Sequence, residues 1–388
     1  MKPLNPTFSG ASVTIFTIMS ALANEHGAIN LGQGFPDSDG PLALRQRAAR
    51  ALIEGPNQYP PMMGEPALRA ALAAHAQRFY DLAYDSRDEV LVTSGGTEAL
   101  TASIMGVVKP GDEVVLIEPA YDSYRPIVEA MGGVARPLRL APPDWSLTEA
   151  ALAAAFSDKT KAIILNSPMN PIGKVFARHE LELIATYLNR FDAIAICDEV
   201  YEHLTFDDVK HTPLAALPGM RERSVRIGSA GKMFSFTGWK VGWVEGPRAL
   251  IGAISRAHQF ITFTTPNALQ IAVAEGLETE ESYLLGLARD LQARRDLLSA
   301  RLEDIGFEPQ PSQGTYFLTV SIRKLGFNGS DVDFCMHITE HAGVAAIPLS
   351  VFFTGDAPHH LVRFAFCKQR HILEEAAARL AAYFGKAS

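Results

Sequence analysis

Short apolar runs alternate with segments of helical period from about residue 90 to residue 250. The apolar runs are VLVT, EVVLIE, AIILN, AIAICD, SVRIGS and VGWVEG, and the helical segments include SLTEAALAAAF and ARHELELIATYLNRF. Near-continuous apolar strands that are separated by helices are typical of a mostly parallel sheet with both faces covered. The pattern therefore predicts an α/β fold.

The pattern changes after about residue 280. A charged segment over 283–305 has helical period, the strand-like runs TYFLTVSI, GVAAIP and LVRFAF follow it, and HILEEAAARLAAYFG reads as a last helix. The chain has 388 residues, and one hydrophobic core rarely grows beyond roughly 250–300 residues. We therefore expect a large domain over 43–282 and a smaller α+β domain that combines 1–42 with 283–388.

Composition narrows the class of protein. The net charge of −8 argues against nucleic acid or an anionic membrane as the main partner. No run approaches about eighteen apolar residues, so no membrane span is predicted. The three cysteines, Cys197, Cys335 and Cys367, lack any CxxC spacing. They predict neither a disulfide framework nor a structural metal site, and they favour a reducing, cytoplasmic compartment.

Polar residues follow several of the predicted strands. SGGT follows VLVT, NSPMNP follows AIIL, DEVY follows AIAIC and SAGK follows SVRIG. Because ligands of an open parallel sheet bind beyond the carboxyl ends of its strands, these segments predict a site.

The segments at the strand ends allow more than one interpretation. Gly95, Gly96 and Thr97 suit a phosphate at a helix N-terminus, although Thr97 would equally suit a helix cap. Asp198 needs a cation, a metal or hydrogen-bond donors because an isolated buried carboxylate is costly. A protonated ring nitrogen would serve, as would a salt bridge or a capping role, and the nearby sequence offers no His or carboxylate cluster for a metal. Asn170 precedes a proline and could point into a cleft or simply form a turn.

Two lysines lie in GSAGKMFSFTGWKVGWV, which contains no carboxylate. A lysine in an apolar pocket has a lowered pKa and becomes nucleophilic toward aldehydes. One interpretation makes Lys232 covalent and lets Lys240 and Ser229 bind a phosphate, so that one anionic aldehyde explains both lysines. The alternative is a snorkelling lysine at each end of a buried segment.

The chain resembles a known family. SAGKMFSFTGWKVGW, NSPMNPIGKV, CDEVYEHLTF, NLGQGFPD and HLVRFAFCK look like the signature segments of class I aminotransferases of fold type I, in the family's order. They are most similar to the branch of kynurenine, glutamine and methionine aminotransferases, and within it to the bacterial methionine enzymes. The resemblance implies a seven-stranded, mostly parallel sheet, the cofactor pyridoxal 5'-phosphate and a homodimer with shared active sites.

The resemblance also implies roles for individual residues. Lys232 would hold the cofactor and move a proton at the substrate α-carbon, and Asp198 would pair with the ring nitrogen. Tyr201 and Asn170 would bind the ring's 3-oxygen, and Tyr121 would stack on the ring. The implied phosphate ligands are Gly95, Gly96, Thr97, Ser229 and Lys240, together with Tyr59 of the neighbouring subunit.

The substrate contacts that the resemblance implies are mostly aromatic. Arg363 would bind the substrate α-carboxylate with help from Asn170 and the backbone of Gly34. Phe16, Phe263 and Phe352 would line the side-chain pocket, with Phe263 from the partner subunit. We therefore expect ping-pong transamination of a neutral apolar, sulfur-containing or aromatic L-amino acid with a 2-oxo acid.

Two alternatives remain open at this point. Cysteine-conjugate β-elimination would use the same cofactor and the same residues. A non-catalytic regulatory protein on an aminotransferase scaffold would keep the fold without the reaction.

Overall fold

A seven-stranded sheet forms the centre of the protein. The computed structural model describes residues 2, 4–10 and 13–385. The strand order is β2-β8-β7-β6-β5-β3-β4, and β8 alone among these strands runs antiparallel to its neighbours. The strands are β2 (Val90–Thr93), β3 (Glu113–Glu118), β4 (Val134–Arg139), β5 (Thr160–Asn166), β6 (Ile194–Asp198), β7 (Ser224–Ser229) and β8 (Gly242–Glu245). The predicted α/β fold with a mostly parallel seven-stranded sheet is confirmed.

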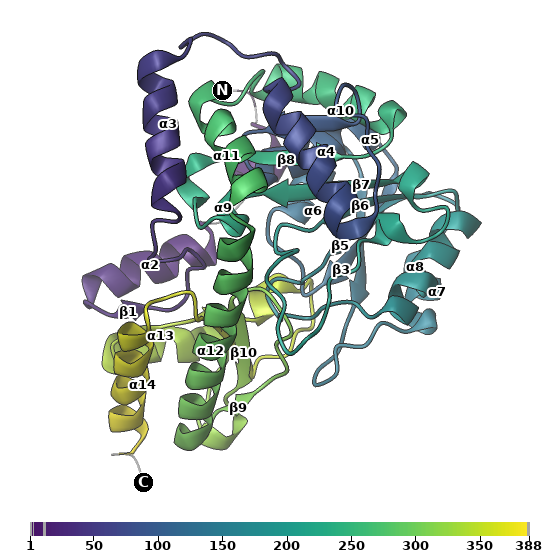
Figure 1. Ribbon diagram of the computed structural model, residues 1–388. Coiled ribbons are helices and arrows are strands. Elements are labelled where there is room, and N and C mark those ends of the chain that lie inside the picture. The colour runs from purple at the N-terminus through teal and green to yellow at the C-terminus, as the bar shows by residue number, and fades with distance from the viewer. Residues whose placement is uncertain (1, 3, 11–12, 386–388) are drawn as a thin grey trace.

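Helices cover both faces of this sheet, which explains why its strands are almost continuously apolar. Successive side chains of a strand point to opposite faces, and β3 sends Val115 into one core cluster and Val114 into another. The first cluster also contains residues of α7 (Glu149–Ala155) and α8 (Arg178–Arg190), and the second contains residues of α5 (Gly96–Val107) and α10 (Arg248–Ile261). Figure 1 shows these helices around the sheet.

The strands outside this sheet join the two ends of the chain. The short strand β1 (Ile29–Asn30) pairs in parallel with β11 (Val344–Ala345). A four-stranded sheet has the order β12-β13-β10-β9, and its strands are β9 (Glu308–Pro309), β10 (Phe317–Ser321), β12 (Ile347–Pro348) and β13 (Leu361–Ala365). The helices α2 (Ile15–Glu25), α13 (Asp331–His341) and α14 (Arg370–Phe384) lie with these strands at the lower end of Figure 1.

The longest helix is α12 (Glu281–Ile305), which starts two residues earlier than the predicted helix over 283–305. It runs from the large sheet to the lower end of the molecule (Figure 1). The remaining helices are α1 (Pro6–Ser9), α3 (Leu42–Glu54), α4 (Pro66–Tyr80), α6 (Tyr124–Ala130), α9 (Ala230–Met233) and α11 (Asn267–Thr279).

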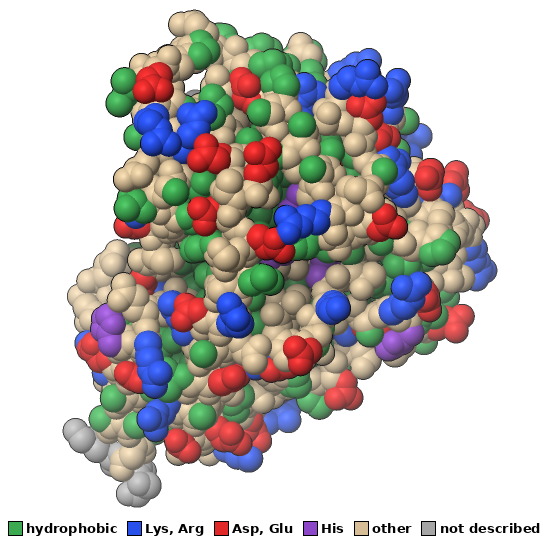
Figure 2. Space-filling view, viewed as in Figure 1, with side chains coloured by type: hydrophobic (Ala, Val, Ile, Leu, Met, Phe, Trp, Pro, Cys, Tyr) green, Lys and Arg blue, Asp and Glu red, His purple; other side chains and the backbone are tan. Residues whose placement is uncertain are grey.

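Figure 2 shows acidic and basic side chains interspersed over one face of the molecule, without a broad basic patch on that face. Within the described residues, no helix combines the length and the apolar character that crossing a membrane requires.

Candidate active site

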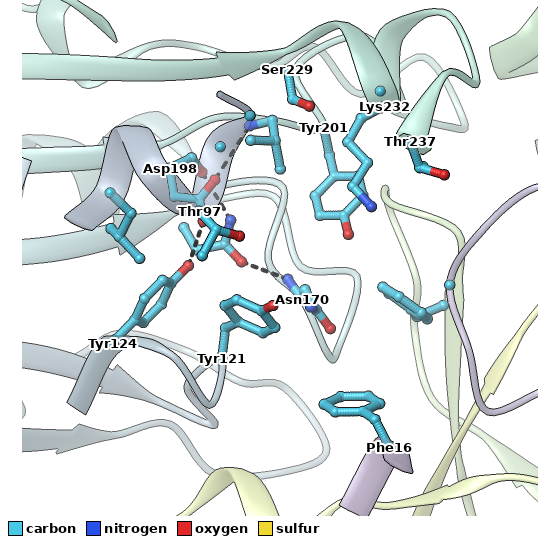
Figure 3. A pocket seen from close by; sticks show the side chains of 18 of the residues that line it. Phe16, Thr97, Tyr121, Tyr124, Asn170, Asp198, Tyr201, Ser229, Lys232 and Thr237 are labelled. Atoms are coloured by element: carbon cyan, nitrogen blue, oxygen red, sulfur yellow. Dashed lines mark hydrogen bonds between the residues drawn. The ribbon is translucent and has the colours of Figure 1, made fainter. Parts of the chain in front are cut away.

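The strand register brings the predicted strand ends to one edge of the sheet. Asn166 of β5 lies opposite Asp198 of β6. On the other side, Gly242 of β8 lies opposite both Ser229 of β7 and Thr93 of β2. A cavity of about 260 Å³ opens at this edge (Figure 3). Its lining residues are Phe16, Gly34, Gly95, Gly96, Thr97, Leu100, Tyr121, Tyr124, Asn166, Asn170, Asp198, Val200, Tyr201, Ser229, Gly231, Lys232, Thr237, Lys240, Phe317 and Arg363.

All of the predicted site residues line this cavity except three. Phe352 is buried behind it, with its ring centroid 6.0 Å from that of Phe16. Tyr59 and Phe263 pack against each other with a centroid distance of 5.4 Å, and their exposed fractions are 82% and 41%. The single chain therefore leaves these two aromatic rings on its surface.

Lys232 lies on the short helix α9, directly after β7. Its ammonium donates a hydrogen bond to the Tyr316 hydroxyl at 2.6 Å, and this hydroxyl donates in turn to the carbonyl of Gly34 at 2.5 Å. Burial lowers the pKa of Lys232 to about 8, against an ordinary value of 10.5. A substantial fraction of this amine is therefore uncharged near neutral pH, as a nucleophile or a general base requires.

Asp198 ends β6 and faces the cavity (Figure 3). Its Oδ2 accepts a hydrogen bond from the Tyr124 hydroxyl at 2.6 Å. Burial raises the pKa of Asp198, and the bond from Tyr124 opposes that rise. Among the described residues Asp198 forms no ion pair within 4.0 Å, so the salt-bridge interpretation of this residue is wrong. The carboxylate is left able to accept from a positively charged ligand group.

The turn before α5 excludes one of the two roles considered for Thr97, that of the helix cap. Gly95 caps the helix with a φ of 84°, a conformation that glycine adopts without strain, so Thr97 lies within the first turn and is not the cap. The N–H of Ser94 is bound instead by the Glu98 carboxylate at 2.9 Å, and Glu98 also contacts His258 Nδ1 at 2.9 Å.

The same turn carries the positive end of a helix and a lysine. A Cβ atom added at Gly95 would lie 3.4 Å from the Lys240 ammonium nitrogen, so this side chain packs over the turn. Ser229, Lys240 and the first residues of α5 all line the cavity. Unpaired N–H groups at a helix N-terminus together with an ammonium group form a site that suits a phosphate.

Arg363 lies on β13 and is only 1% exposed. Its Nη1 donates to Asn170 Oδ1 at 2.7 Å and its Nη2 donates to the Gly32 carbonyl at 2.9 Å, whereas its Nε has no hydrogen-bond partner in the part of the chain that the structure describes. Burial lowers the pKa of this guanidinium to about 10. Its Cζ lies 3.8 Å from the centroid of Phe317. This cation has neutral partners, and one of its donors is unused.

Asn170 is held in place by a second asparagine. The Asn170 N–H donates to Asn166 Oδ1 at 2.7 Å, and Asn166 Nδ2 donates to the carbonyl of Asp198 at 2.8 Å. The bonds run from the end of β6 through Asn166 and Asn170 to Arg363. Figure 3 shows Asn170 pointing into the cavity between Tyr121 and Tyr201.

Four aromatic or amide side chains of the site were not predicted from the sequence. They are Tyr124, Asn166, Phe317 and Tyr316, and the first three line the cavity. Tyr124 lies in EPAYDSY, three residues after Tyr121, and Asn166 opens NSPMNP. Both lie beside residues that were selected, but nothing in the sequence shows which neighbour turns inward.

The comparisons with known proteins identify the family. The family model of class I and II aminotransferases matches residues 26–380. The chain belongs to this family. It is therefore an enzyme that transfers an amino group between an amino acid and an oxo acid, and its cofactor is pyridoxal 5'-phosphate.

Three relatives show how close the likeness is. A probable N-succinyldiaminopimelate aminotransferase from Mycobacterium tuberculosis is 47% identical over 95% of this chain and 96% of its own length. The solved structure of that enzyme has a TM-score of 0.96 at 45% identity and covers 98% of this chain and 100% of its own. A methionine aminotransferase from Escherichia coli is 41% identical, covering 95% of each chain. A kynurenine–oxoglutarate transaminase 3 from Rattus norvegicus is 38% identical over 95% of this chain and 87% of its own length.

The cavity fits the cofactor of this family. The α5 N-terminus, Ser229 and Lys240 suit its phosphate, and the Lys232 amine suits its aldehyde. The Asp198 carboxylate, which forms no ion pair among the described residues, suits a protonated ring nitrogen, and the Nε of Arg363 is free to bind another anion.

Proposed function

We propose that this aminotransferase acts on a neutral apolar, sulfur-containing or aromatic L-amino acid of the methionine, phenylalanine, tyrosine or kynurenine type, with a 2-oxo acid as acceptor. The observation that carries the proposal is the surroundings of Arg363. Its Cζ lies 3.8 Å from the ring centroid of Phe317, 5.3 Å from that of Phe16 and 5.4 Å from that of Phe352. A guanidinium that binds one carboxylate amid aromatic rings favours an amino acid with an uncharged side chain.

We also propose specific roles for the residues around the cofactor. The bound cofactor supplies an electron sink for the charge that develops at the substrate α-carbon. Asp198, supported by Tyr124, keeps the ring nitrogen protonated. Tyr121 covers the ring face, while Asn170 and Tyr201 bind its 3-oxygen. The phosphate ligands are Gly95, Gly96, Thr97, Ser229 and Lys240.

Lys232 moves the proton in this proposal. Its amine takes a proton from the α-carbon of the bound substrate and returns it to the cofactor's side of the reaction centre. The lowered pKa keeps enough of this amine uncharged to act as a base near neutral pH. Tyr316 accepts a hydrogen bond from the amine and thereby orients it. Arg363, held by Asn170 and Gly32, fixes the substrate carboxylate.

A homodimer with shared active sites is part of the proposal. Tyr59 would reach the partner's phosphate and Phe263 the partner's substrate pocket. Large apolar side chains are exposed on the same segments, notably Phe260 at 80% and Ile53 at 83%. Exposed large apolar side chains are the kind of surface that a subunit interface covers. Sedimentation analysis of the holoenzyme should give the mass of two chains.

The remaining predictions are carried forward as proposals. We propose that the chain divides into a large domain over 43–282 and a small domain formed by 1–42 and 283–388, so that Arg363 and Lys232 come from different domains. A reducing, cytoplasmic location and the absence of a nucleic-acid partner also remain predictions. The three cysteines are free and buried.

The reaction is tested by the visible spectrum of the holoenzyme. Adding L-methionine should bleach the absorption of the bound cofactor aldehyde, and a 2-oxo acid should restore it. Lys232→Ala should abolish this cycle. A spectrum that methionine leaves unchanged but that phenylalanine or kynurenine bleaches would keep the mechanism and replace the proposed donor.

A second candidate substrate has support from one relative. The N-succinyldiaminopimelate aminotransferase of M. tuberculosis is 47% identical to this chain, and its substrate carries carboxylates beyond the reacting carbon. Such groups require additional cations, whereas the cations that line the cavity are Lys232, Lys240 and Arg363. Comparing kcat/KM for methionine, phenylalanine and N-succinyldiaminopimelate decides between the two. Pyruvate and ammonia formed from a cysteine conjugate without an oxo acid would instead show β-elimination.

A further inference from the structure

A cluster of histidine and glutamate side chains lies outside the cofactor cavity. His75 of α4 and His203, two residues after Tyr201, bring their Nε2 atoms to 2.7 Å from each other. Glu202 lies beside them, and the ligand atoms of all three side chains lie within 4.8 Å of one another. In the described part of the chain, no other group of three or more His, Cys, Asp or Glu side chains brings its ligand atoms this close.

We propose that His75, Glu202 and His203 bind a divalent transition-metal ion of the zinc type. Two imidazole nitrogens and one carboxylate oxygen are ligands that such ions prefer, and a water molecule would complete four-fold coordination. The proposal rests on the contacts among these side chains and is independent of the substrate proposed above.

The distances fit an ion after a small movement. Zinc binds imidazole nitrogen at about 2.0–2.1 Å, so two tetrahedral nitrogen ligands lie about 3.3 Å apart. The Nε2 atoms are 2.7 Å apart while an N–H···N hydrogen bond joins them. Binding would separate the rings by roughly half an ångström. The ring that carries its proton on Nε2 would carry it on Nδ1 instead, so no proton has to leave the pair.

The surroundings of the cluster resemble the outer shell of a metal site. The Phe79 ring packs against both imidazoles, with centroid distances of 4.7 Å to His75 and 4.9 Å to His203. Glu202 Oε2 accepts a hydrogen bond from Arg226 Nη2 at 2.9 Å. A hydrogen-bonded carboxylate and an apolar wall are the features that orient metal ligands and limit solvent access.

The charge balance of the region favours an additional cation. Arg226 contacts the carboxyl groups of Glu199, Glu202 and Glu245 at 2.7–2.9 Å. Burial raises the pKa of Glu245 to about 8, so this group holds a proton near neutral pH, and two carboxylates remain beside one guanidinium. Buried carboxylates are stable only when they are paired, protonated or metal-bound. An ion held by Glu202 would offset part of this negative charge.

An ion can reach the cluster from solvent. His203 is only half-buried, although His75 and Glu202 are buried. A bound ion would tie α4 to the segment between Asp198 and His203, which carries two of the proposed cofactor ligands.

Zinc binding by the untagged, chelator-treated holoenzyme tests the proposal. Titration with Zn²⁺ should show one tight site per chain, and the bound ion should raise the thermal unfolding temperature of the holoenzyme. His75→Gln and His203→Gln, which act on different elements, should each weaken binding at least about 100-fold. Zinc X-ray absorption of the wild type should show two imidazole ligands and needs no variant to fold.

A matched control uses another histidine pair. His337 and His341 lie one turn apart on α13, with ring centroids 4.5 Å from each other. The double variant His337→Gln/His341→Gln should leave the tight site unchanged. The proposal is overturned if the wild type binds no Zn²⁺, or if the control abolishes binding while His75→Gln does not.

Discussion

Two arginines of this chain are almost equally buried, but one is surrounded by acidic groups and the other by neutral ones. Arg226 is 3% exposed and Arg363 is 1% exposed. Arg226 contacts three carboxylates, at 2.7 Å for Glu199 and 2.9 Å for both Glu202 and Glu245. Within the described residues, the hydrogen-bond partners of Arg363 are an amide oxygen and a backbone carbonyl, and its Nε has none.

The difference separates a structural cation from one that awaits a ligand. Burial alone would lower the pKa of either guanidinium. At Arg226 the three carboxylates outweigh burial, and the pKa is raised well above its ordinary value. At Arg363 burial prevails, and the pKa falls to about 10. Because Arg363 is desolvated and has no carboxylate partner among the described residues, it is suited to bind an anion from outside the protein. We propose that this anion is the substrate carboxylate.

The largest expected effect is on stability at Arg226. Arg226→Met leaves buried carboxylates without their cation and should lower the free energy of unfolding by about 3–5 kcal/mol. Urea denaturation measures this change. Arg363→Met is the matched control and should change stability by less than about 1 kcal/mol, because it removes a desolvated charge without exposing a carboxylate. Equal losses in the two variants would contradict the comparison.

The next effect is on catalysis at Arg363. Arg363→Met should lower kcat/KM for the amino acid donor roughly a hundredfold, because the substrate carboxylate loses its partner. This corresponds to a rise of about 3 kcal/mol in the activation free energy. Arg363→Lys should recover only part of the activity, since an ammonium group lacks the planar fork of a guanidinium. Steady-state kinetics test both variants, and full activity in the methionine variant would remove Arg363 from the site.

A smaller effect concerns the desolvated amine of Lys232. The folded state holds this amine at a pKa of about 8, whereas the unfolded chain restores the ordinary value of 10.5. Between these pH values the unfolded state binds more protons, so folding becomes more favourable as the pH rises. Relative to Lys232→Met, the apoenzyme should gain about 1–3 kcal/mol between pH 8 and 10.5. A difference that does not vary over this window would show that the amine is not desolvated.

The smallest expected effect concerns the support of Asp198. Tyr124→Phe removes a hydrogen bond to the half-buried carboxylate of Asp198 and should weaken cofactor binding by about 1–2 kcal/mol, or roughly tenfold. Tyr84→Phe is the control, because that hydroxyl is buried without a hydrogen-bond partner in the described structure. Fluorescence titration of the apoenzyme with pyridoxal 5'-phosphate measures both. A loss in the control as large as in Tyr124→Phe would assign the effect to packing.

The sheet and the strand-end residues could be predicted because their signals are local. An apolar run marks each strand, and α/β connectivity brings the carboxyl ends of parallel strands to one edge. Asn166, Asp198 and Ser229 meet there for that reason alone. The start of α5 differs from one of the two interpretations of Thr97, because Gly95 occupies the cap position and Thr97 lies in the first turn.

The residues around Arg226 could not be predicted, because their contacts join distant parts of the chain. Glu199 and Glu202 follow Asp198, but of the other residues near them in sequence only His203 belongs to the histidine and glutamate cluster. His75 comes from α4, more than a hundred residues earlier. The roles predicted for Tyr59 and Phe263 are untested by a single chain, because both roles require a second subunit.

The most direct test of the comparison uses two substrates that differ in one group. The best amino acid donor and the amine that lacks only its carboxylate are compared by kcat/KM, in the wild type and in Arg363→Met. The wild type should prefer the amino acid by at least about a hundredfold, and the variant should show almost no preference. If the variant still discriminates strongly between the two substrates, the carboxylate is bound elsewhere and Arg363 is a structural residue like Arg226.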